Sequence, residues 1–157
     1  MDGLGRSVYA GGLFAVLGVL AWLTGQPLVF PSLGPTAFLF AFEGVPNHTR
    51  RRVVGGHAIG ALAGLLAHLL LASGLVLSAG EPSLSVEWIR LGASGTLAVA
   101  LTAWGMAVTD TVHAPACATT LIVSLGLLAA PIHVVGIVAS VVVLTETHLA
   151  VSTRLPV

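Results

Sequence analysis

Six stretches of apolar residues follow one another along the chain, separated by short polar or Gly- and Pro-containing breaks. The apolar runs are continuous over helical lengths and do not alternate with a period of two, which favours membrane helices over the strands of a transmembrane barrel. The second and fifth stretches are short and are broken by proline near their start. We expect the segments at about 8–23, 28–42, 53–78, 88–108, 114–130 and 131–144.

The composition places these segments in a lipid bilayer. Hydrophobic residues make up 56% of the sequence and charged residues only 8%, against about 25% charged residues in soluble domains. A chain of 157 residues has room for about six crossings of roughly 20 residues and for little else. The sequence therefore predicts one all-α transmembrane domain over residues 1–157. The net charge of zero gives no indication of nucleic acid as a partner.

The order long, short, long occurs twice, which predicts two related units at about 1–80 and 84–157. Three local matches, spaced by about 82, 80 and 81 residues, support this division: Ala21-Trp22 with Ala103-Trp104, Pro35 with Pro115, and Val53-Val54-Gly55 with Val134-Val135-Gly136. Each match alone is weak, because such small and apolar residues are common in membrane helices. Together they favour a duplication.

The arginines predict the topology, because basic residues in short loops are retained in the cytoplasm. If all six segments cross, Arg6, Arg50–Arg52 and Arg154 share one side and Arg90 lies opposite. If the short segments dip in and return, four crossings remain and Arg50–Arg52 move to the other side. The charges favour six crossings in a cell membrane, with both termini cytoplasmic. Three crossings per unit would invert the second unit relative to the first, as in many transporters.

The two short segments form the candidate transport site. A broken helix places its N-terminus near the midplane, where the positive end of the helix dipole attracts an anion. Proline suits the first helical turn, where its missing amide hydrogen costs nothing. The alternative is that these prolines mark ordinary kinks, with nearby hydroxyls bonded to helix carbonyls. The candidate substrate-binding residues are Ser32, Gly34, Pro35, Thr36, His113, Pro115, Cys117 and Thr119.

Asp110 and His113 are the candidate proton-coupling residues, because ionisable groups in membrane segments usually pair and face a cavity. The alternative places both at the cytoplasmic interface, with Asp110 capping the next helix. We favour this alternative for Asp110. We favour the transport site for His113, because it adjoins Pro115.

Small residues at Gly56, Gly60 and Gly64 form a row that lets another helix approach closely. Packing within the chain is the simpler use of this row, and a homo-oligomer is a further possibility. His57 and His68 lie about three turns apart, without the close pair that helical metal sites use, so we expect no metal or cofactor. Hydrolase, phosphate-loop and dinucleotide motifs are absent from the sequence, so we do not expect an enzyme.

The stretch from His113 to Leu121 resembles the defining motif of the HPP family of integral membrane proteins, which usually reads His-Pro-Pro followed by small residues. Ser32–Ala37, Pro46-Asn47 and Val53–His57 are similar to other motifs of that family, and the resemblance covers about residues 30–125. Ala114 stands where the family has its first proline, and the tail from Glu146 lacks an asparagine-rich ending. The family is commonly described with four spans. Its plastid and cyanobacterial members are linked to nitrite transport, so the resemblance implies a small-anion transporter.

We therefore expect a transporter or channel for a small inorganic anion, with nitrite as the first candidate, bound between the N-termini of the two short segments. The competing hypothesis is a non-transporting scaffold or accessory subunit, packed through the row of Gly56, Gly60 and Gly64. It predicts that the short segments pack together without a polar cavity.

Overall fold

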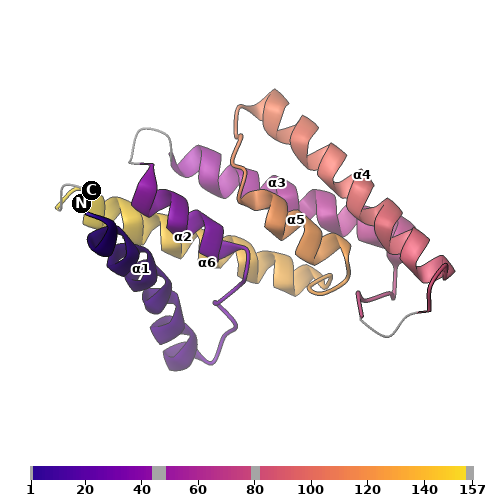
Figure 1. Ribbon diagram of the computed structural model, residues 1–157, viewed down its shortest axis with the longest axis horizontal. Coiled ribbons are helices and arrows are strands. Elements are labelled where there is room, and N and C mark those ends of the chain that lie inside the picture. Colours follow the sequence, from indigo (N-terminus) through magenta and orange to yellow (C-terminus); the bar gives the residue numbers. More distant parts are fainter. Residues whose placement is uncertain (1, 44–48, 79–81, 155–157) are drawn as a thin grey trace.

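The computed structural model describes residues 2–43, 49–78 and 82–154, and every regular element in these ranges is helical (Figure 1). This confirms the all-α prediction. The Pro46-Asn47 pair lies outside the described residues. The elements are α1 (Gly3–Thr24), α2 (Leu33–Phe42), α3 (Arg50–Ala67), the π-helical turn η2 (His68–Ala72) that continues α3, α4 (Val86–Thr109), α5 (Ala116–Ser124) and α6 (Pro131–Ser152).

Four helices in the described part of the chain are long and apolar enough to cross a membrane: α1, α3 with η2, α4 and α6. They have 22 to 24 residues, which corresponds to about 33–36 Å of helix and matches a hydrocarbon core of about 30 Å. α2 has 10 residues and α5 has 9, so each covers only about half of that thickness. The two short segments are therefore half-helices preceded by non-helical chain.

The short helices are shorter than the sequence predicts, and backbone conformation explains the difference. The chain before α2 contains Pro27 and Pro31, and the helix begins only at Leu33. α5 ends at Ser124 instead of near residue 130, and Gly126 follows with a φ of 82°. This left-handed conformation suits glycine and stops a helix.

One end of the bundle, here called the basic end, gathers the starts of α1 and α3 and the ends of α4 and α6. Arg50 of α3 pairs with Glu146 of α6, and Arg52 pairs with Asp110, which follows α4. The start of α1 and the end of α6 lie close together at this end (Figure 1). Each short helix, with its non-helical lead, thus carries the chain from one end of the bundle to the other.

At the opposite end of the bundle, Arg90 near the start of α4 donates a hydrogen bond from Nε to the carbonyl oxygen of Leu71, at 2.8 Å. Arg90 therefore lies away from the other arginines, as expected. α1, α3 and α5 leave the basic end, whereas α2, α4 and α6 approach it (Figure 1).

The glycine row of α3 packs against α5 within the same chain. A Cβ atom added to Gly60 would lie 2.7 Å from Thr120 Oγ1 and 2.9 Å from the carbonyl oxygen of Ala116. A Cβ atom added to Gly64 would lie 2.7 Å from the carbonyl oxygen of Thr120. Backbones that approach this closely tolerate only small residues. The row therefore sets the position of α5, and α5 carries half of the candidate site.

We expect Gly60→Ala to destabilise the fold, because its methyl group meets backbone atoms that cannot move without shifting α5. Overpacking of this kind costs about 1–3 kcal/mol, which outweighs the gain in helix propensity of about 1 kcal/mol. Gly92→Ala is the matched control, since nothing lies within 4 Å of a Cβ at Gly92 on α4. Thermal unfolding in detergent should show a lower midpoint for Gly60→Ala and an unchanged or higher midpoint for Gly92→Ala. A midpoint for Gly60→Ala at or above that of the wild type contradicts the packing described above.

Candidate functional site

The N-terminus of α5 is closed by a tight turn. The amides of Ala116, Cys117 and Ala118 donate to the carbonyl oxygens of His113, Ala114 and Pro115, at 3.0, 3.0 and 3.1 Å. Pro115 precedes the helix and has no amide hydrogen to place. The first amides of α5 are thus already paired, so an anion at this helix end would be bound by side-chain donors together with the field of the helix dipole.

Four buried side chains form a hydrogen-bonded group, here called the Thr/His cluster: Thr36, His57, His113 and Thr119. Thr36 Oγ1 of α2 lies 2.9 Å from His57 Nε2 of α3 and 3.2 Å from His113 Nε2, just before α5. His57 Nδ1 lies 2.7 Å from Thr119 Oγ1 of α5. The cluster therefore joins the two short segments directly, through Thr36 and His113, and also through His57 of α3.

The cluster can be fully hydrogen-bonded with neutral histidines. A hydroxyl donates once and also accepts, and a neutral imidazole donates from one ring nitrogen and accepts at the other. The chain of contacts Thr119–His57–Thr36–His113 can therefore have its donors aligned in either direction. Reversing the direction exchanges the tautomers of His57 and His113. Such a chain can take up a proton at one end and deliver one at the other.

His57 is the central residue that sequence reasoning missed. The sequence places His57 about three helical turns from His68, and this spacing argues against a metal site formed by the two histidines. In the fold, His68 lies further along the same helical segment and contacts the carbonyl oxygen of Ser124 through Nδ1, at 3.3 Å. The available signal was the position of His57 next to Gly56 and one turn before Gly60. A histidine beside a row of glycines on a close-packed helix face has no room to be solvated and needs partners on the neighbouring helix.

The other predicted residues surround the cluster at different depths. Ser32 precedes α2 one turn before Thr36, and its hydroxyl is buried without a hydrogen-bond partner among the described residues. Cys117 is half-buried and lines a cavity of about 240 Å³ together with Thr102, Met106 and His113. The structure thus brings Thr36, His113 and Thr119 together, and places Cys117 beside them.

The two prolines do converge, but on a different surface. Pro35 and Pro115 both line an open groove between α2 and α5, whose other residues include Phe38 and Leu39. A Cβ atom added to Gly34 would have nothing within 4 Å of it. This groove is mainly apolar, so the polar contacts between the two segments are those of the Thr/His cluster.

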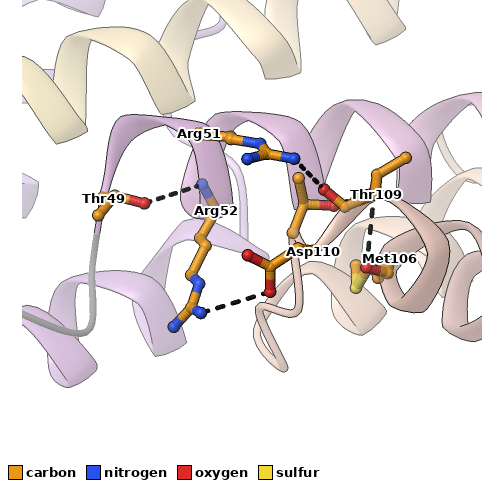
Figure 2. A network of polar contacts seen from close by, with 7 residues as sticks. Thr49, Arg51, Arg52, Met106, Thr109 and Asp110 are labelled. Atoms are coloured by element: carbon orange, nitrogen blue, oxygen red, sulfur yellow. Dashed lines mark hydrogen bonds and ion pairs between the residues drawn. The ribbon is translucent and has the colours of Figure 1, made fainter.

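Asp110 and His113 lie in different surroundings, since His113 is buried and Asp110 is exposed. Asp110 ends α4 in the left-handed conformation with φ of 52°, and its carboxylate faces Arg52 Nη2 at 3.4 Å (Figure 2). Its side chain is 72% exposed. Asp110 also does not cap α5, because Pro115 occupies the N-cap position of that helix without a side-chain bond. Asp110 therefore lies at the basic end, while His113 lies inside the bundle.

A family model described as the transmembrane region of HPP proteins matches residues 6–155. No similar protein was found among curated proteins, and none among solved structures. The family match covers all four long helices and both short ones.

Proposed function

The chain belongs to the HPP family of multi-pass membrane proteins, and we propose that it transports a small inorganic anion, with nitrite as the first candidate. The observation that carries this proposal is the Thr/His cluster, where side chains of both short segments meet a histidine of α3. Buried hydroxyl and imidazole groups are costly inside a membrane bundle, and such groups usually mark a substrate or proton path.

An anion in this cluster would accept hydrogen bonds from Thr36, Thr119 and the two imidazoles. When an imidazole is protonated, both of its ring nitrogens donate, so the anion and the proton are held as a pair with no net charge. A pair of this kind crosses a low-dielectric region at a much smaller cost than an isolated anion. We therefore propose that the anion and a proton move together, with His113 as the proton-coupling residue and His57 as its neighbour.

The arrangement of the helices supports an inverted repeat, in which the cluster lies between two related halves. The three passes have 22, 10 and 23 residues in the first half and 24, 9 and 22 in the second. Corresponding helices run in opposite directions. In transporters with this architecture, one half moves against the other around a fixed site and exposes it to each side in turn.

Two other functions are less well supported. The scaffold hypothesis expects the chain to pack through its glycine row, and α5 does cover Gly60 and Gly64. Packing alone, however, does not need the buried imidazole and hydroxyl groups of the Thr/His cluster, which are costly inside a membrane bundle. Catalysis would need an acid near the histidines, and Asp110, the acid nearest to His113 in sequence, pairs with Arg52 at the basic end. We therefore place transport ahead of both.

Purified protein in liposomes provides the test. We expect nitrite uptake above that of empty liposomes, and faster uptake when the outside is made more acidic. Parallel assays with nitrate, formate and chloride identify the anion class. If liposomes with correctly folded protein take up none of these anions faster than empty liposomes, the proposed function is wrong.

We also propose that the basic end is cytoplasmic, because basic residues accumulate on that side. Five of the six arginines lie in segments that meet there: Arg6, Arg50, Arg51, Arg52 and Arg154. A fluorescent protein that matures only in the cytoplasm, fused after the last residue, should fluoresce in bacteria. A dark fusion with full-length expression contradicts this orientation.

A further inference from the structure

Arg50 and Glu146 face each other across a groove at the basic end. Arg50 is the first residue of α3, and its guanidinium donates from Nε and Nη2 to the two carboxylate oxygens of Glu146 on α6. The Nη2 to Oε2 distance is 2.6 Å. This two-pronged geometry is the one in which a guanidinium recognises a planar oxyanion.

The groove beside this ion pair lies between α3, α6 and the chain that precedes α5. Arg50, Glu146, Gly55 and Thr111 are among the residues that line it. Thr111 lies against α3, since its Cγ2 atom is 2.9 Å from a Cβ built on Gly55. His57 lies seven positions after Arg50, which is about 10 Å along the helix. The ion pair therefore borders a groove that also includes Thr111, two residues before His113.

Arg50 differs from the two arginines that follow it. Arg51 donates from Nη2 to the carbonyl oxygen of Thr109 at 2.6 Å, and so holds the end of α4 (Figure 2). Arg52 makes a single, longer contact with Asp110, at 3.4 Å. Among these three arginines, Arg50 is the one whose fork holds both oxygens of a carboxylate.

The exposure of the pair makes it exchangeable. The side chains of Arg50 and Glu146 are 65% and 45% exposed, and solvent-exposed ion pairs contribute little to stability. A dissolved anion with two coplanar oxygens on one atom offers Arg50 the same two acceptors as the carboxylate. A spherical halide ion offers a single centre and cannot occupy both prongs in this way.

We infer that Arg50 is the entry site for the transported anion, and that Glu146 acts as a built-in competitor which the anion must displace. This inference rests on the proposed transport function and narrows its substrate class to planar oxyanions with two coplanar oxygens, such as nitrite and formate. Displacement of Glu146 frees the groove between α3 and α6. The ion pair forms again once the anion has moved on.

The test measures initial uptake against anion concentration in liposomes, for the wild type and three variants. Glu146→Gln keeps the shape of the side chain and removes its charge, so the KM for nitrite should fall severalfold. Arg50→Lys keeps the positive charge and removes the two-pronged guanidinium, so the KM for nitrite should rise about tenfold. In this variant, formate should inhibit nitrite uptake no more strongly than chloride does. Asp110→Asn is the matched control for charge at this end and should leave the KM unchanged.

A measurement of anion binding tests the proposed entry site independently of the proposed transport function. Formate should raise the thermal unfolding midpoint of the wild-type protein in detergent, through preferential binding to the folded state, and should not raise that of Arg50→Lys.

If the wild type transports anions but both variants keep its KM and its preference for formate, the entry site is wrong and the transport function stands. If nothing is transported and formate still stabilises only proteins that retain Arg50, the binding site stands without the transport function. If formate stabilises neither protein, and no anion is transported, both are wrong.

Discussion

Replacing His57 with alanine should reduce nitrite uptake to the level of empty liposomes. His57 joins Thr36 to Thr119, so its loss removes the only described residue that contacts both hydroxyls and opens a void in the bundle. A buried group left without its hydrogen-bond partner costs about 1–3 kcal/mol. The measurement is initial uptake at equal amounts of folded protein, checked by size-exclusion chromatography.

His68→Ala is the matched control for this experiment. His68 is also buried and lies three turns further along the same helical segment, but its ring contacts a backbone carbonyl of Ser124, outside the cluster. We expect it to retain transport.

Thr119→Val keeps the shape of the site and removes a single hydroxyl, so it separates chemistry from folding. It should lower uptake about tenfold to a hundredfold, which corresponds to the same 1–3 kcal/mol. Wild-type uptake by Thr119→Val and His57→Ala, both folded, would show that the anion does not pass through the cluster.

Replacing His113 with alanine should remove the dependence of uptake on pH. His113 lines the cavity that also contains Cys117, and it contacts Thr36. It is therefore the member of the cluster from which a proton can pass between the cavity and Thr36. The measurement is uptake between about pH 5 and pH 8, the range in which histidine changes its charge. The wild type should be faster at low pH, and His113→Ala should be slow and nearly independent of pH.

Asp110→Asn distinguishes the two candidate coupling residues in the same assay. Asp110 faces Arg52 at the basic end, so we expect this variant to keep the pH dependence of the wild type. If Asp110→Asn loses the pH dependence and His113→Ala retains it at an unchanged rate, coupling belongs to the carboxylate and our assignment is wrong.

The arrangement of the short segments could be predicted in part from local sequence. Pro35 and Pro115 correctly marked two helices that are too short to cross alone, because proline is confined to the first turn of a helix. Their ends were less predictable. The apolar run after Ser124 continues to residue 130, yet α5 stops where Gly126 adopts a left-handed conformation, a choice that apolar composition does not encode.

Only the part of the candidate site that lies in the two short segments was predictable from the sequence. Thr36, His113 and Thr119 stood out as polar residues beside the prolines, whereas His57 lies 21 residues from Thr36 and 62 from Thr119. Its role depends on which face of α3 meets the short helices. The pairing of Asp110 was equally hidden, since the competing partner, Arg52, is 58 residues away.

The sequence by itself determined that this protein is an all-helical membrane protein with two short, broken segments and its arginines gathered mainly at one end. These properties follow from apolar run length, proline position and charge, which act locally. Only the tertiary structure decided that the two short helices meet on α3, and that His57 lies between their hydroxyls. That outcome depends on how closely α5 approaches the glycines of α3, because hydrogen bonds of about 3 Å form only when the helices that carry the partners are already packed.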